Sequence, residues 1–191
     1  MTTLVAVQGN GWSAIGCDSR ATEDNGMVMQ LATPKIIENN GYLIAVAGAS
    51  RGGNLVQFGW KPPKPKSNLS LDALDTFMTK TFVPALRKLF IDSGFDMKDD
   101  GDTASFDSSL IVSVQGVLYP IFEDYSWDRE ERNVYIAGSG SSYALGAMCA
   151  LGYDKCKTPE QAEKVIRKSI EIAKQWDAFT AGDIHTYTQR K

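Results

Sequence analysis

The chain has 191 residues, a length that suits one domain and can bury a full hydrophobic core without disulfides or metal ions. Apolar residues make up 43% of the chain and charged residues 23%, and the formal net charge is −3. This charge argues against a general nucleic-acid-binding protein, because that class is usually basic. No apolar run approaches 18 residues, which argues against a membrane span.

The three cysteines, Cys17, Cys149 and Cys156, do not follow a metal-binding pattern. With His185 as the only histidine, a structural zinc site is not expected, and the sequence indicates no metal or cofactor. A sparse, odd number of cysteines fits a reducing compartment. The N-terminus lacks a charged segment followed by an apolar one, so we expect a cytoplasmic protein.

The first 60 residues predict two β-hairpins and a helix. The first hairpin joins residues 4–7 to 12–17 through a turn at Asn10-Gly11, a pair typical of tight hairpin turns. Residues 19–34 are polar and contain turn signals. The second hairpin joins residues 35–38 to 42–47. The glycine-rich segment 48–53 then leads into a helix, which ends before the proline-rich segment 61–66.

Residues 70–93 predict a long helix, with Ser70 as its N-cap and Gly94 as its stop. Pro84 should kink or divide it. The expected apolar face consists of Leu74, Met78, Phe82, Ala85 and Leu89. Residues 95–107 form an acidic, glycine-containing loop, and the acidic residues at 99, 100 and 102 should be solvated.

The second half predicts a third hairpin (110–114 and 117–122), a short strand (134–137), two helices and a last strand (183–188). The first of these helices covers residues 142–151. The second begins at Thr158-Pro159, where Thr158 and Gln161 match a capping box. Runs of strands followed by runs of helices favour an α+β fold with antiparallel sheets. Two sheets stacked between helical layers, an αββα sandwich, would cover every apolar face, and residues 1–191 contain no linker to a second domain.

The N-terminus carries the first chemical signal, Met1-Thr2. Methionine is normally removed before a small residue, which would leave Thr2 with a free α-amine beside its own hydroxyl. A threonine hydroxyl needs an adjacent base to act as a nucleophile. An α-amine has a reference pKa of roughly 7.7–8.0, which is close to the working pH that a general base requires.

Asp18 and Lys35 supply a second signal, since each lies at a predicted strand end. A buried lysine beside the terminal amine would disfavour protonation of that amine by like-charge repulsion. Asp18 would pair with Lys35 and make its charge tolerable in the interior. Without Thr2, these two residues would be read as a plain salt bridge.

Four motifs in order resemble the proteasome β-subunit and HslV peptidase family over nearly the whole chain. Residues 2–7 (TTLVAV) and 15–22 (IGCDSRAT) are similar to the family's N-terminal half, and Lys35 follows at nearly the family spacing. Gly48 ends a strand where the family places its oxyanion-binding glycine. Residues 138–144 (GSGSSYA) resemble the family's Gly-Ser-Gly turn, and residues 177–182 (DAFTAG) resemble its late Asp-Ala-Tyr-Ser-Gly-Gly segment.

The resemblance implies the four-layer fold of N-terminal-nucleophile hydrolases and a threonine endopeptidase. Thr2 would be the nucleophile, Lys35 would lower the pKa of its amine, and Asp18 would orient Lys35. The Gly48 N–H would stabilise the oxyanion, and a polar shell would surround the amine. That shell consists of Ser139, Asp177 and Thr180. Arg20, Thr22 and Ala49 would contribute to substrate binding.

The resemblance further implies six- or seven-fold homo-oligomeric rings that enclose the sites and admit unfolded proteins or peptides. The chain has no phosphate-binding Gly-x4-Gly-Lys-Ser/Thr loop, so any ATP-dependent unfoldase would be a separate partner. Two alternatives stay open. A chain that retains Met1 would fit a non-catalytic ring or scaffold subunit, and an open monomer with a polar pocket would fit an amidohydrolase for a small amide.

Overall fold

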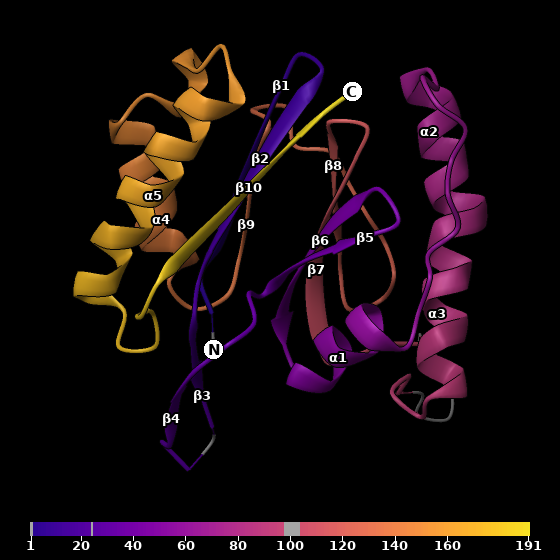
Figure 1. Ribbon diagram of the computed structural model, residues 1–191, viewed down its shortest axis with the longest axis horizontal. Helices are drawn as coiled ribbons and strands as arrows, with labels where there is room; N and C mark the ends of the chain where they lie inside the picture. The colour runs from indigo at the N-terminus through magenta and orange to yellow at the C-terminus, as the bar shows by residue number, and fades with distance from the viewer. Residues whose placement is uncertain (1, 24, 98–103) are drawn as a thin grey trace.

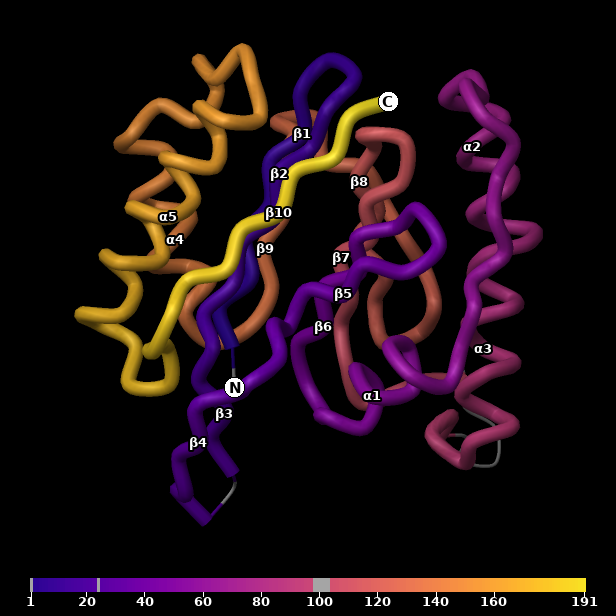
Figure 2. The backbone as a smooth tube through the Cα atoms, viewed as in Figure 1, coloured from indigo at the N-terminus to yellow at the C-terminus, as the bar shows by residue number. Residues whose placement is uncertain are grey.

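The computed structural model describes residues 2–23, 25–97 and 104–191 and contains two four-stranded antiparallel sheets flanked by helices (Figure 1). The strands of the first sheet lie in the order β10-β2-β1-β9, and those of the second lie in the order β5-β6-β7-β8. Figure 2 shows that the C-terminal strand β10 runs along β2, on the side away from β1.

The first sheet is built on the N-terminal hairpin. It comprises β1 (Leu4–Gly9), β2 (Trp12–Asp18), β9 (Val134–Ala137) and β10 (Ile184–Arg190). Gly11 in the hairpin turn has φ +73°, a left-handed conformation that glycine adopts without strain. The pairing of β1 with both β2 and β9 secures the segment that directly follows Thr2.

The second sheet consists of two consecutive hairpins. It comprises β5 (Ile36–Asn39), β6 (Tyr42–Gly48), β7 (Ser108–Val114) and β8 (Val117–Ile121). Asn40-Gly41 and Gln115-Gly116 form the two turns, and all four residues have positive φ, as a type I′ hairpin turn requires. The predicted second and third hairpins are confirmed.

Three hydrophobic clusters define four layers. One cluster packs α4 (Ser141–Ala150) and α5 (Pro159–Trp176) against the first sheet. A second lies between the two sheets, and a third packs α1 (Ser50–Phe58), α2 (Leu71–Phe77) and α3 (Val83–Asp92) against the second sheet. The predicted αββα sandwich is therefore confirmed (Figure 1). A 3₁₀ turn, η2 (Tyr153–Lys155), connects α4 to α5.

The helix predicted for residues 70–93 exists but changes its winding. Ser70 caps it, because its hydroxyl accepts a hydrogen bond from the Ala73 N–H at 3.3 Å. A π-helical turn, η1 (Met78–Phe82), separates α2 from α3. Pro84 is the second residue of α3. The predicted division of the helix at this proline therefore occurs as the wider, π-helical turn that precedes it.

The π-helical turn shifts the buried face of α3 by one residue. Leu86 and Phe90 are fully buried, whereas the predicted Ala85 and Leu89 are only partly buried. A π-turn places more residues in one turn than an α-helix does, so a spacing based on 3.6 residues loses its phase after it. The sequence prediction for these two positions was wrong for this reason.

Two further differences concern segments that were predicted as loops. A two-stranded hairpin, β3 (Arg20–Thr22) and β4 (Val28–Gln30), lies in the segment predicted only as polar. Gly52 and Gly53 lie inside α1 instead of before it. The acidic positions 99, 100 and 102 lie outside the described residues. Within the described ranges, no helix is long and apolar enough to cross a lipid bilayer.

Candidate active site

A cavity of about 160 Å³ opens where the N-terminal segment, the β3 hairpin and the end of β6 meet the start of α1. Thr2, Lys35 and Gly48 all contribute to its wall. Apolar side chains also line it, including Leu31, Ile37 and Val46. The cavity therefore combines three of the predicted catalytic residues with a partly apolar recess beside them.

Asp18 and Lys35 form a buried ion pair next to this cavity. The Lys35 Nζ lies 2.7 Å from Asp18 Oδ1, and the two side chains are 6% and 0% exposed. Asp18 ends β2 and Lys35 directly precedes β5, so the pair links the two sheets. A pair so deeply buried loses its hydration and must be compensated by good geometry and additional hydrogen bonds.

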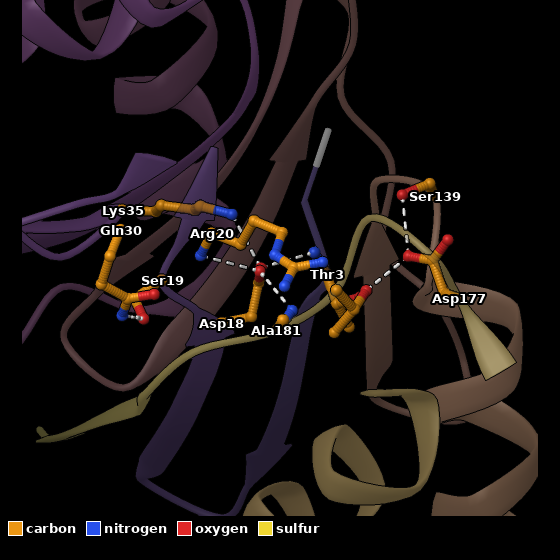
Figure 3. Close-up of polar contacts among 10 residues, drawn as sticks. Thr3, Asp18, Ser19, Arg20, Gln30, Lys35, Ser139, Asp177 and Ala181 are labelled. Atoms are coloured by element: carbon orange, nitrogen blue, oxygen red, sulfur yellow. Dashed lines mark hydrogen bonds and ion pairs between the residues drawn. The ribbon is translucent and has the colours of Figure 1, made fainter. Parts of the chain in front are cut away.

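Backbone amides supply that compensation around Asp18 (Figure 3). Oδ1 also accepts a hydrogen bond from the Thr3 N–H at 2.9 Å. Oδ2 accepts from the N–H groups of Arg20 at 3.1 Å and Ala181 at 3.3 Å. Together with Lys35, four donors surround the carboxylate, which is about as many as a carboxylate can accept. Asp18 therefore joins the N-terminal segment, the turn after β2 and the segment after α5.

A second carboxylate, Asp177, gathers hydroxyl groups on the other side of the N-terminal segment (Figure 3). Its Oδ2 accepts hydrogen bonds from Thr180 Oγ1 at 2.5 Å and from Ser139 Oγ at 3.0 Å. The Thr180 hydroxyl also makes a short hydrogen bond with the Thr3 hydroxyl. The structure thus brings Ser139, Asp177 and Thr180 together, and their role as a shell around the Thr2 amine stays a prediction.

Gly48 occupies a position that no other residue fits. Its φ is +122°, and a Cβ atom there would lie 2.7 Å from both the Asp107 carbonyl oxygen and the Ser108 Cα. The next residue, Ala49, donates its N–H to Asp107 at 3.0 Å. Gly48 is exposed at the cavity wall, where its backbone can be reached by a ligand.

The predicted substrate-binding residues fall in two places. Thr22 and Ala49 line the cavity. Arg20 does not, because its guanidinium donates to the Ala178 carbonyl at 3.0 Å and so supports the segment after α5. Ala47, which directly precedes Gly48, is buried between the two sheets.

Cys17, one residue before Asp18 on β2, is buried between the sheets. Burial raises the pKa of its thiol to about 12, so the thiol is neutral and unsuited to nucleophilic chemistry. No cluster of three or more metal-ligating side chains occurs within the described ranges.

The sequence did not reveal the roles of three residues that shape the site: Thr3, Gly138 and Gly140. A Cβ atom on Gly138 would overlap the Thr2 carbonyl oxygen, and one on Gly140 would overlap the hydroxyls of Thr3 and Thr180. The Gly-Ser-Gly motif was recognised, but the roles of its glycines depend on contacts with Thr2, Thr3 and Thr180, which are not neighbours in the sequence. Thr3 was part of the recognised segment 2–7, but nothing in the local sequence indicated a role for its side chain.

No protein-family model matches the chain. Over 70 residues the chain is 33% identical to proteasome subunit beta type-8 from Canis lupus familiaris, a match that covers 37% of this chain and 25% of that subunit. Because the match spans only a quarter of that subunit, the sequence identity alone does not show that this chain has the same activity.

Solved structures extend the likeness to the full length. BPH from Thiobacillus denitrificans, in complex with epoxomicin, superposes with a TM-score of 0.76 at 19% identity, covering 99% of this chain and 98% of BPH. HslV from Trypanosoma brucei gives a TM-score of 0.65 at 18% identity, covering 100% of both chains. The resemblance seen in the sequence is confirmed: this chain has the fold of the proteasome β-subunit and HslV-like family of N-terminal-nucleophile hydrolases.

Proposed function

We propose that the chain is a threonine endopeptidase subunit in which Thr2, after removal of Met1, attacks peptide bonds. One observation carries the proposal above all. Thr2, Lys35 and Gly48 line the same cavity, so a nucleophile, a buried cation and a conformationally restricted glycine face a common space. A scaffold subunit would not require this combination.

The proposed reaction begins when the Thr2 hydroxyl oxygen attacks the carbonyl carbon of the substrate peptide bond. The Thr2 amine accepts the hydroxyl proton and returns it to the departing amine, which leaves an ester between Thr2 and the acyl fragment. Water then hydrolyses this ester and releases the second product. The amine must be uncharged at the start, and Lys35 favours that state through like-charge repulsion.

Gly48 would stabilise the oxyanion that forms during both steps. Its exposure at the cavity wall leaves its backbone open to a substrate, and its positive φ fixes the peptide orientation. A single preorganised oxyanion donor is typically worth roughly 3–4 kcal/mol of transition-state stabilisation. Thr22 and Ala49, which both line the cavity, would hold the substrate backbone as an added strand.

The substrates would be unfolded proteins or peptides, and the site would be enclosed in a six- or seven-fold ring. Two similar folds support this proposal, since BPH binds epoxomicin in the solved complex and HslV shares the fold over its full length. A ring would hide the sites from folded proteins, and a separate ATP-dependent unfoldase would deliver substrates. A cytoplasmic location fits this activity and stays a prediction.

The test compares wild-type protein with Thr2→Ala and Thr2→Ser. Each protein is assayed for hydrolysis of a fluorogenic peptide and sized by analytical ultracentrifugation. We expect wild-type hydrolysis, partial activity in Thr2→Ser, none in Thr2→Ala, and the same ring in all three. Undiminished hydrolysis by Thr2→Ala would overturn the proposal. An inactive wild-type ring would favour a scaffold subunit, and an active monomer would favour a small-amide hydrolase.

A further inference from the structure

Thr3 lies between the two carboxylate clusters and is fully buried (Figure 3). Its N–H donates to Asp18 Oδ1 at 2.9 Å, and its carbonyl accepts from the Asp18 N–H at 3.4 Å. Its hydroxyl makes the short hydrogen bond with Thr180, which in turn contacts Asp177. One residue therefore connects the Asp18–Lys35 pair to the Asp177 hydroxyl cluster.

The hydrogen bonds from Thr3 through Thr180 to Asp177 have a defined order of donors and acceptors. The Thr180 hydroxyl has one hydrogen, and it donates that hydrogen to the Asp177 carboxylate at 2.5 Å. The hydrogen bond between the two threonine hydroxyls must therefore be donated by Thr3. Because the chain of hydroxyls ends on a carboxylate, each bond in it is strengthened by the charge at the end.

The Thr2–Thr3 peptide group is held at both edges. A peptide group is planar, so the Thr3 N–H and the Thr2 carbonyl lie in one plane on opposite sides. The N–H is bound by Asp18, and the carbonyl oxygen packs so closely against Gly138 that a Cβ atom there would overlap it. Because this peptide plane is fixed, the orientation of the Thr2 Cα relative to it is restricted, although terminal residues usually fray.

Gly140 provides an independent indication that the local structure accommodates the hydrogen-bonded hydroxyls of Thr3 and Thr180. A Cβ atom there would overlap the Thr3 and Thr180 hydroxyl oxygens and would lie 2.8 Å from Asp177 Oδ2. A glycine at this helix N-cap therefore leaves the space that the hydroxyl chain occupies.

We propose that Thr3 is a positioning residue that aligns Thr2 for attack. It does so through the hydrogen bond between its hydroxyl and Thr180 and the hydrogen bond that its backbone N–H donates to Asp18. This inference rests on the proposed function. Thr3 is not among the residues that line the cavity, so it acts through Thr2 and not through the substrate. Its loss should consequently slow the reaction without weakening substrate binding.

The test compares wild-type protein with Thr3→Val, which keeps the shape but removes the hydroxyl, and Thr3→Ser, which keeps the hydroxyl. For Thr3→Val we expect kcat to fall on the order of tenfold to a hundredfold, the range that a small misplacement of reacting groups produces. KM should stay within about twofold, since the cavity wall is unchanged. Thr3→Ser should restore most of kcat, and labelling of Thr2 by epoxomicin should slow in proportion to kcat.

A second readout separates positioning from general stability. Thr180→Val removes the acceptor of the same hydrogen bond, so adding Thr3→Val to it should lower kcat little further. Independent, multiplicative losses would contradict the shared bond. Melting temperatures are measured for every variant. Should Thr3→Val be unfolded at the assay temperature, Thr3→Ala takes its place beside Thr3→Ser.

The outcomes distinguish this inference from the proposed function. An active wild type with unchanged kcat in Thr3→Val, a rise in KM alone, or no rescue by Thr3→Ser would overturn the positioning role and leave the peptidase proposal intact. A wild type that neither hydrolyses peptides nor reacts with epoxomicin would overturn the peptidase proposal and the positioning role together.

Discussion

Replacing Asp18 with asparagine changes the charge of a fully buried side chain while nearly preserving its shape. The wild-type carboxylate accepts hydrogen bonds from Lys35 and from three backbone N–H groups. Asparagine offers only one acceptor oxygen, so its NH₂ group must face two donors. The Lys35 ammonium would also lose its buried counter-charge.

The expected cost follows from this geometry. Removing one partner of a buried ion pair typically destabilises a protein by about 3–5 kcal/mol. At about 2–4 °C per kcal/mol for a domain of this size, the melting temperature should fall by about 6–20 °C. Hydrolysis should also be lost, because Asp18 holds both Lys35 and the Thr3 N–H.

Asp92→Asn provides a matched control. Asp92 pairs with Lys88 at 2.9 Å, but the two side chains are 57% and 74% exposed. An exposed pair of this kind contributes about 0–1 kcal/mol, so the melting temperature should change little. Differential scanning calorimetry of both variants tests the reasoning. If Asp18→Asn melts within about 2 °C of Asp92→Asn, the buried ion pair does not contribute the stability assigned to it.

The remaining predictions concern Lys35, Gly140 and Cys17. Lys35→Met should abolish peptide hydrolysis but lower the melting temperature less than Asp18→Asn does, since Asp18 keeps its three backbone donors; an unchanged rate would remove Lys35 from the mechanism. Gly140→Ala should reduce activity strongly because its methyl group enters the hydroxyl cluster, whereas Gly146→Ala, in open space on α4, should leave activity unchanged and serves as the control. Burial raises the pKa of Cys17 from 9.0 to about 12, so its thiol stays neutral in the folded protein. Its contribution to stability is present below pH 9.0 and is lost as the pH rises towards about 12. Iodoacetamide at pH 8 should therefore alkylate exposed Cys149 and spare Cys17, as peptide mass mapping will show; labelling of Cys17 at the rate of Cys149 would contradict its burial.

Local sequence signals were sufficient for most of the fold. The Asn10-Gly11 pair predicted the first hairpin turn, and Gly11 adopts the positive φ that such a turn needs. The cap at Thr158 was predicted from a four-residue pattern, and its hydroxyl accepts from the Gln161 N–H at 3.3 Å. These features depend on neighbours in the chain, which a single sequence contains.

Features that depend on distant neighbours were harder to predict. Asp18 and Lys35 were suggested as a pair from their places at predicted strand ends, but a separation of 17 residues has no local periodicity that would establish the contact. The π-helical turn before Pro84 shifted a buried face that a regular helical period could not follow. Thr3 was missed because its partners come from β2 and from the segment after α5.

The central claim is that Thr2 carries a free amine and acts as the nucleophile. Intact-protein mass spectrometry before and after incubation with epoxomicin tests it most directly, with peptide mapping to locate the adduct. The account predicts a chain that lacks Met1 and gains one adduct on Thr2, and no adduct in Thr2→Ala. A chain that retains Met1 and gains no adduct, or that is labelled elsewhere, would contradict it.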